Sequence, residues 1–184
     1  MSFVGEPIRL GSAEGRVLFT EAEIRGRVDE MGRTLRRTLA GEIPIFIALL
    51  NGGFVFLADL VRAFGAPHEV DFLKVTRYDP EQRDSTEVRV LHDLRGSIRD
   101  RVVVVVEAVR AKGTKIEYVD QFLKLHHPRR VLYCAMIHPG GANETVALDQ
   151  IGFRIDDQYV VGYGLDYREQ YRNLPFICAL GSVS

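Results

Sequence analysis

The sequence is poor in the residues from which metal and disulfide frameworks are built. Its 184 residues include two cysteines and five histidines. Two cysteines and a few scattered histidines do not make a zinc framework. Cys134 and Cys178 stand in the apolar runs VLYCAMI and PFICAL, so we expect two buried free thiols, as in proteins of a reducing compartment.

The chain also lacks long apolar runs and a strong net charge. No stretch approaches the roughly 18 apolar residues of a membrane span, and residues 1–15 contain no apolar core of a signal peptide. The formal net charge of −1 excludes a global attraction to nucleic acid or anionic lipid, although local patches could provide one. We therefore expect a cytoplasmic protein without a membrane partner.

The order of apolar segments predicts a single α/β domain over residues 1–184. Arg16–Phe19 is a candidate small edge strand. Residues 20–41 have helical periodicity, with a capping box at Thr20 and Glu23 and a stop at Gly41. Further strands are expected in the segments IPIFIALL, EVDFLKVTRY, EVRVLHDL, RVVVVVEA, RRVLYCAMI, IGFRI, YVVGYG and PFICAL. Helices are expected in FVFLADLVRAFG and TKIEYVDQFLKLHH.

Strands that are apolar throughout and alternate with helices indicate a mainly parallel sheet covered on both faces. Ligands of such folds bind beyond the carboxyl ends of the strands. Two strand-to-helix loops there, LLNGGF and EAVRAKGTK, could hold an anion on backbone amides and lysines. The alternatives are a tight turn at the glycines and solvated surface lysines.

A third candidate is the polar and aromatic segment that follows an apolar strand near the C-terminus. Asp166 could bind a metal ion or cap a turn. Tyr159 could stack on a flat ligand or pack against the protein.

Three stretches together resemble the hypoxanthine(-guanine) phosphoribosyltransferases, the type I phosphoribosyltransferases of purine salvage. They are LLNGGFVFLADLVR, VDFLKVTRY followed by VRVLHDL, and IGFRIDDQYVVGYGLDYREQYRNLPFICAL. The resemblance runs from about Glu21 to Leu180. It implies the type I phosphoribosyltransferase fold, a mainly parallel twisted sheet flanked by helices with a small hood formed by the chain termini.

The resemblance also implies an activity. The family transfers ribose 5-phosphate from phosphoribosyl pyrophosphate to N9 of a 6-oxopurine with Mg²⁺ and releases pyrophosphate. A homodimer or homotetramer that binds phosphoribosyl pyrophosphate and a purine base or nucleoside monophosphate is therefore expected.

The resemblance assigns roles to individual residues. Leu50, Asn51 and Gly52 match the pyrophosphate-binding loop, in which the Leu50–Asn51 peptide is often cis. Tyr78 matches the flexible catalytic loop, where Arg77 replaces a serine. The remaining assignments are Arg172 for pyrophosphate, Asp166 for the metal, Tyr159 for stacking on the purine, Val160 for main-chain contacts to it, and His138 at the position of the purine-selecting lysine.

The family motif is altered between Glu107 and Lys115. Its pattern is two acids, two aliphatic residues, Asp, Ser or Thr, Gly, any residue and Thr, whereas this chain has EAVRAKGTK. Glu107 is retained, but Ala108 replaces the second acid and Ala111 replaces the aspartate credited with general acid/base work. Lys112 and Lys115 replace the two hydroxyls that bind the 5'-phosphate, on either side of Gly113 and Thr114.

These changes predict a protein that binds nucleotide or phosphate and catalyses the salvage reaction weakly or not at all. Loss of a positioned general base costs about 10²–10⁴ in rate. Arg110, Lys112 and Lys115 make the loop strongly positive, so we expect phosphate binding to persist.

Three other interpretations remain open. One is a working enzyme with an altered site, in which Asp79 or Asp84 supplies the missing acid. Another is a non-catalytic or regulatory homologue that acts through oligomer contacts. Nucleic-acid binding by the basic loop is the weakest, because no aromatic–basic interleaving accompanies it.

Overall fold

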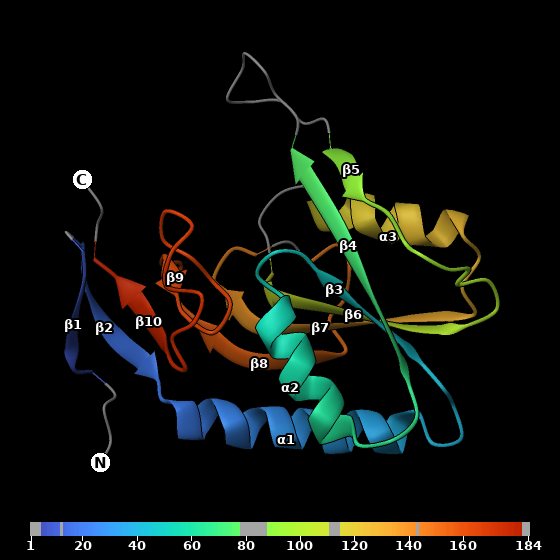
Figure 1. Ribbon diagram of the computed structural model, residues 1–184, viewed down its shortest axis with the longest axis horizontal. Helices are drawn as coiled ribbons and strands as arrows, with labels where there is room; N and C mark the ends of the chain where they lie inside the picture. The colour runs from blue at the N-terminus through green and yellow to red at the C-terminus, as the bar shows by residue number, and fades with distance from the viewer. Residues whose placement is uncertain (1–4, 12, 78–87, 111–114, 143, 182–184) are drawn as a thin grey trace.

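A computed structural model describes residues 5–11, 13–77, 88–110, 115–142 and 144–181. The chain forms a larger six-stranded sheet with helices on both faces and a smaller four-stranded sheet beside it (Figure 1). The smaller sheet contains strands from both ends of the chain, so the N- and C-terminal parts lie together at one side of the molecule.

The larger sheet is parallel except at one edge. Its strand order is β5 (Val88–His92), β4 (Glu69–Arg77), β3 (Ile45–Leu49), β6 (Val102–Val109), β7 (Arg130–Pro139) and β8 (Gln150–Ile155). Only the β4–β5 pair is antiparallel. The predicted fold class, a mainly parallel sheet flanked by helices, is confirmed.

The first helix begins where the sequence predicts. In α1 (Glu21–Thr38), the Thr20 hydroxyl accepts from the Glu23 amide at 3.3 Å, and the Glu23 carboxylate accepts from the Thr20 amide at 2.8 Å. The helix ends at Thr38 with Leu39 as its cap, so Gly41 lies beyond the cap.

Side chains along the central strands point alternately to the two faces of the sheet, so the core is divided between those faces. Phe46, Ala48, Val104 and Val106 pack in the cluster that contains residues of α1 and α2 (Phe54–Phe64). Residues next to them in sequence, such as Ile47 and Val105, pack in the cluster that contains residues of α3 (Lys115–Leu125). Because both faces are covered, β3 is apolar along its length and β6 is apolar from Val102 to Val106.

The smaller sheet forms the predicted hood. Its antiparallel order is β1 (Pro7–Leu10), β2 (Ala13–Phe19), β10 (Ile177–Leu180) and β9 (Val160–Val161). The prediction of an edge strand at Arg16–Phe19 is wrong, because β2 pairs with β1 on one side and with β10 on the other. The sequence pattern of β1 is too short to predict a strand there that would pair with β2.

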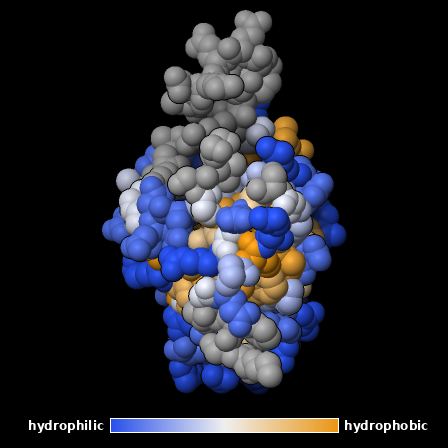
Figure 2. Space-filling view, turned by 90° about the vertical axis from the view of Figure 1, so that its left-hand side faces the viewer, coloured by the Kyte–Doolittle hydropathy of each residue, from blue (hydrophilic) through white to orange (hydrophobic). Residues whose placement is uncertain are grey.

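Both cysteines are buried and free, as predicted. On the hood side of the molecule, hydrophilic surface surrounds a smaller hydrophobic area (Figure 2). Over the described residues, the structure contains no helix that is both long enough and apolar enough to cross a membrane.

Candidate functional site

A cavity of about 340 Å³ opens at the carboxyl ends of β3 and β6. These strands are parallel neighbours, and their following helices, α2 and α3, pack on opposite faces of the sheet. Such a switch point is where open α/β sheets bind ligands. The lining residues are Leu49, Leu50, Asn51, Gly52, Gly53, Glu107, Ala108, Val109, Lys115, Ile116, Leu165, Asp166, Glu169 and Arg172.

The first wall of the cavity is the loop between β3 and α2. The Leu50–Asn51 peptide is cis, as the family resemblance predicts. The Gly53 amide donates to the Leu49 carbonyl at 3.0 Å. A Cβ on Gly53 would lie 2.9 Å from the carbonyl oxygens of both Leu49 and Val106, so a side chain does not fit there.

The second wall is formed by residues 162–172, the 162–172 segment. Gly164 has φ +96°, and a Cβ on it would lie 2.3 Å from the Gly52 carbonyl oxygen. This contact brings the segment directly against the first wall. Non-glycine residues with positive φ also gather in the segment, namely Tyr163, Arg168, Glu169 and Tyr171. Such backbone conformations are held only by strong local contacts and gather at functional sites.

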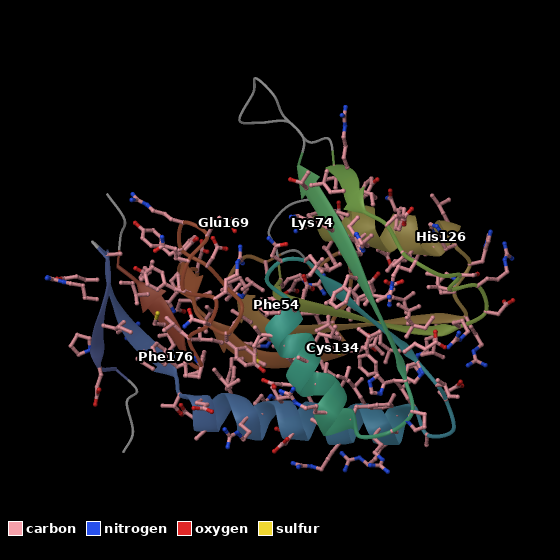
Figure 3. The ribbon with its side chains drawn as sticks, in the orientation of Figure 1. Phe54, Lys74, His126, Cys134, Glu169 and Phe176 are labelled. Atoms are coloured by element: carbon pink, nitrogen blue, oxygen red, sulfur yellow. The ribbon has the colours of Figure 1, made fainter. Side chains whose placement is uncertain are left out.

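Arg172 organises the acidic side chains of the 162–172 segment. Its guanidinium lies 2.9 Å from Asp166 Oδ1 and 2.9 Å from Glu169 Oε2, and it donates to the Gly164 carbonyl at 3.0 Å. The second oxygen of Asp166 accepts from the Glu169 amide at 2.9 Å. Figure 3 shows Glu169 on the loop beside β9. The structure thus pairs the two residues that sequence comparison assigned to metal and pyrophosphate.

The acidic residues of this wall fit a magnesium ion that arrives with a phosphate ligand. No cluster of three or more His, Cys, Asp or Glu suited to a metal exists among the described residues. Mg²⁺ is usually bound by one or two carboxylates, with the remaining ligands supplied by substrate phosphates and water. Asp166 and Glu169, which both line the cavity, provide such carboxylates.

The third wall, β6, presents different residues to its two sides. Ala108 continues the row of Val104 and Val106, and its Cβ lies 3.4 Å from where a Cβ on Gly52 would stand. Glu107 continues the row of Val105 on the α3 side and is 4% exposed. The wall therefore presents a methyl group on one side and a nearly buried carboxyl group on the other.

Arg110 lies inside the protein, whereas the sequence predicted that it would belong to a positive binding loop. That expectation is wrong, because Arg110 is 0% exposed and does not line the cavity. Its Nε lies 3.1 Å from Glu107 Oε1, and its guanidinium carbon lies 5.8 Å from the centre of the Tyr133 ring. The Glu107–Arg110 contact has ion-pair distance but not the alignment of a hydrogen bond. Among the described residues, Glu107 Oε1 and the three guanidinium nitrogens have no hydrogen-bond partner.

Burial dominates the protonation behaviour of this pair. It raises the pKa of Glu107 to about 7, although the positive charges of Arg110 and Lys115 act in the opposite direction. Burial also lowers the pKa of the Arg110 guanidinium. Glu107 therefore changes its charge near neutral pH.

Lys115 is the only residue of the four predicted phosphate-binding positions 112–115 that the structure describes. It begins α3 and lines the cavity, and its binding of phosphate stays a prediction. Ala111, Lys112, Gly113 and Thr114 lie outside the described residues, as does Tyr78.

The predicted base-binding residues lie apart from the lining of the cavity. His138, on β7, is 7% exposed, with Nε2 3.6 Å from Glu144 and Nδ1 3.4 Å from Arg154. Tyr159 is 54% exposed, and its hydroxyl donates to the Asp166 carbonyl at 2.8 Å. This bond connects Tyr159 to the acidic wall. Val160 is buried in β9.

Two features of the site escaped the sequence analysis. Glu169 shares Arg172 with Asp166, and its spacing of three residues from each in DYREQYR was the available signal. The inward position of Arg110 was also missed, although the family pattern has an aliphatic residue there. An aliphatic position at the end of a mainly apolar strand indicates burial, whatever residue occupies it.

Comparison with known proteins gives one consistent family. The phosphoribosyl transferase domain family matches residues 20–168. Hypoxanthine phosphoribosyltransferase of Salmonella typhimurium is 37% identical over 164 residues, which cover 88% of this chain and 92% of that protein. Hypoxanthine-guanine phosphoribosyltransferase of Bacillus subtilis is 32% identical over 166 residues, which cover 90% of this chain and 92% of that protein.

Solved structures agree with the sequence relatives. A hypoxanthine phosphoribosyltransferase from Staphylococcus aureus superposes with a TM-score of 0.85 at 30% identity, covering 90% of this chain and 91% of that one. A hypoxanthine-guanine phosphoribosyltransferase from Bacillus anthracis, with HEPES in its active site, gives a TM-score of 0.82 at 29% identity and covers 90% of this chain and 96% of that one.

Proposed function

The chain belongs to the hypoxanthine phosphoribosyltransferase family, and from this we propose that it binds phosphoribosyl pyrophosphate or a purine nucleoside monophosphate but catalyses purine salvage weakly or not at all. The reaction in question joins a 6-oxopurine to ribose 5-phosphate and releases pyrophosphate. The binding half of the proposal and the catalytic half rest on different parts of the cavity.

The observation that carries the proposal is the contrast between the first two walls of the cavity and the third. The loop with the cis Leu50–Asn51 peptide and the wall with Asp166 and Arg172 both line the cavity, and they carry the residues that the family resemblance assigns to pyrophosphate and metal. The β6 wall presents Ala108 where the family has a second acid. Binding groups are thus kept on the walls that hold the leaving group, and lost on the wall that serves the sugar.

The losses act on the chemical step. In the family, the acid at position 111 exchanges a proton with the base nitrogen, and a methyl group at Ala111 has no proton to exchange. Losing such a group costs about 10²–10⁴ in rate. Loss of the hydrogen bond between a sugar hydroxyl and a charged partner weakens binding by about 1.5–3 kcal/mol. Because both positions belong to one motif, these costs need not add.

Positive groups support continued binding of the phosphates. Lys115 lines the cavity at the start of α3, and Lys112 stands three residues before it in the sequence. A lysine replaces a hydroxyl donor as a point charge. When bound, Mg²⁺ would neutralise charge that develops on the leaving pyrophosphate, and Asp166 and Glu169 would hold it.

Three residues would contact the purine in the family's manner. Tyr159 would stack on it, Val160 would contact it through its backbone, and His138 would donate a hydrogen bond to the 6-oxo group. The exposed ring of Tyr159, fixed by its hydroxyl bond to the Asp166 backbone, supports stacking. His138 supplies one donor where the family has a lysine, so we expect weaker selection of the 6-oxo group.

A second candidate function follows from the same substitutions. A family member that binds nucleotide without turning it over would serve as a regulatory subunit, in a homodimer or homotetramer or with an active relative. Ala108 in the cavity wall favours this function over a fully active enzyme. Light scattering during size-exclusion chromatography would measure the oligomeric state with and without nucleotide.

The test pairs binding with turnover on the unmodified protein. Calorimetric titration with phosphoribosyl pyrophosphate, pyrophosphate and inosine monophosphate, with and without Mg²⁺, should detect binding. Turnover assays with hypoxanthine, guanine and xanthine should show little or none. Robust turnover would refute the loss of catalysis, and the absence of binding of all three ligands would refute the proposal as a whole.

A further inference from the structure

The helix α2 is connected to both the first and the second wall of the cavity. Its N-cap, Gly53, belongs to the loop that forms the first wall. Asp59, near the middle of the same helix, accepts a hydrogen bond from the hydroxyl of Tyr163 at 2.7 Å. Tyr163 belongs to the 162–172 segment, which forms the second wall. Because an α-helix is held by hydrogen bonds along its length, α2 fixes the separation of the two walls.

The side chain of Tyr163 is enclosed by the core. It is 5% exposed and belongs to the cluster that contains residues of α1 and α2. Burial raises the pKa of its hydroxyl, so the hydroxyl stays protonated and remains a donor at neutral pH. The Oδ1 atom of Asp59 pairs with Arg62, and the Oδ2 atom accepts from Tyr163. Both carboxylate oxygens of Asp59 are thus held in place.

Backbone hydrogen bonds connect Tyr163 to Arg172. The Tyr163 amide donates to the Leu174 carbonyl at 2.8 Å, and the Gly164 amide donates to the Arg172 carbonyl at 2.9 Å. The Arg172 side chain donates in return to the Gly164 carbonyl at 3.0 Å and pairs with Asp166 at 2.9 Å. A displacement of Tyr163 would therefore move Arg172 and, through it, Asp166.

The backbone of Tyr163 has an unfavourable conformation that this hydrogen bond helps to hold. Its φ is +52°, in the left-handed region that residues with a side chain seldom adopt. Such a conformation persists only where the surrounding contacts maintain it. Loss of the bond to Asp59 would therefore favour release of the 162–172 segment from its place against the first wall.

Asp59 and Tyr163 act from outside the candidate cavity. They line a second cavity of about 580 Å³ between α1, α2 and residues 172–175. Neither is among the described residues that line the first cavity, whereas Arg172 lines both. A substitution at Asp59 or Tyr163 therefore keeps the groups that face the ligand and alters only their positions.

We propose that Asp59 and Tyr163 are positioning residues for pyrophosphate binding, and that their hydrogen bond holds the 162–172 segment where Asp166 and Arg172 act together on the ligand. The inference rests on the proposed function, which assigns Asp166 and Arg172 to metal and pyrophosphate. The apparent affinity of a ligand falls with the fraction of the protein in the arrangement that binds it. Loss of the bond therefore weakens binding without removing any group that touches the ligand.

Calorimetric titration with pyrophosphate in the presence of Mg²⁺ is the first arm of the test. Tyr163→Phe removes only the hydroxyl and should weaken binding by about tenfold, the equivalent of one hydrogen bond to a charged group. Asp59→Ala should cause the same loss, and D59A/Y163F should bind no more weakly than either single variant. Asp59→Asn keeps an oxygen acceptor and should restore most of the affinity. Additive losses in the double variant would overturn the joint role.

Tyr133→Phe is the matched control for the loss of a buried hydroxyl. The Tyr133 hydroxyl donates to Asp120 on α3 at 3.0 Å, so this variant removes a bond of the same kind on the other face of the sheet. It should lower Tm but leave the affinity for pyrophosphate unchanged. Equal losses of affinity in the two tyrosine variants would assign the effect to general destabilisation and overturn the positioning role.

Hydrogen–deuterium exchange of the free protein is the second arm and needs no ligand. Tyr163→Phe should speed exchange in the 162–172 segment, while β3 and β6 exchange as in the unmodified protein. Unchanged exchange in the segment, or equal acceleration throughout the chain, would overturn the role of the hydrogen bond. If Tyr163→Phe does not fold, Asp59→Ala carries both arms.

The outcomes separate this inference from the proposed function. Unmodified affinity for pyrophosphate in folded Tyr163→Phe and Asp59→Ala would overturn the positioning role and leave the proposed function intact. Failure of the unmodified protein to bind pyrophosphate would count against the proposed function, and hydrogen–deuterium exchange would then decide the role of the hydrogen bond alone.

Discussion

Replacing Glu107 with glutamine should remove a fall in stability that the unmodified protein shows between about pH 4.5 and pH 7. Glu107 is 4% exposed, and burial raises its pKa from 4.5 to about 7. In this window the folded protein retains a proton that the unfolded chain has released. The free energy of unfolding therefore falls as the pH rises.

The magnitude follows from the distance between the two pKa values. At about 1.4 kcal/mol per pH unit, the interval from 4.5 to 7 corresponds to roughly 3 kcal/mol. This is a large share of a typical folding stability of about 5–15 kcal/mol. The sign is opposite to that of an acid stabilised by a surface salt bridge, because burial outweighs the attraction of Arg110 and Lys115.

Urea unfolding followed by circular dichroism at intervals from pH 4 to pH 8 would measure this effect. The difference in unfolding free energy between the unmodified protein and Glu107→Gln should fall by about 3 kcal/mol across the range. Glu6→Gln, at an exposed glutamate, controls for the loss of a surface carboxyl group. A difference that stays constant, or that increases with pH, would show that folding does not raise the pKa of Glu107 and would refute the reasoning.

Three further predictions concern the walls of the cavity and the helix cap. Thr20→Ala should lower the unfolding free energy by about 1 kcal/mol because it removes the capping box, whereas Thr20→Ser should not; equal losses would contradict a hydroxyl role. Gly164→Ala should weaken pyrophosphate binding and cost about 1–3 kcal/mol, because its Cβ would meet the Gly52 carbonyl at 2.3 Å with φ at +96°; wild-type melting and affinity would show that the two walls do not touch. Asp166→Asn should reduce the enhancement of pyrophosphate binding by Mg²⁺ in calorimetry while leaving metal-free binding nearly unchanged, and an unchanged enhancement would remove Asp166 from the metal site.

Strong local patterns made most of the fold predictable. The apolar runs of β3 and β6 predicted strands buried on both faces, and Thr20 with Glu23 predicted the start of α1. Pairing partners were less accessible. The prediction of an edge strand at Arg16–Phe19 failed because the partners of β2 are β1, whose sequence signal is weak, and β10, which is more than 150 residues away in the sequence.

The candidate site was predictable where family motifs fix the backbone. It was not predictable where the burial or exposure of a single side chain depends on the folded surroundings. The cis peptide before Asn51 followed from the motif. Lys115, a predicted phosphate-binding residue, lines the cavity. Arg110 was read as part of a positive loop because an arginine is normally exposed. Its burial depends on Tyr133 and Glu107, whose placement around it is a property of the folded sheet.

The central claim is that the altered β6 loop removes catalysis while leaving binding. The most direct measurement is the ratio of turnover rates, at saturating phosphoribosyl pyrophosphate, Mg²⁺ and hypoxanthine, between the unmodified protein and the double variant Ala108→Asp with Ala111→Asp. We predict that restoring the two acids raises the rate by about 10²-fold or more. Comparable rates, with robust turnover by the unmodified protein, would contradict the claim and make this loop a variant active site.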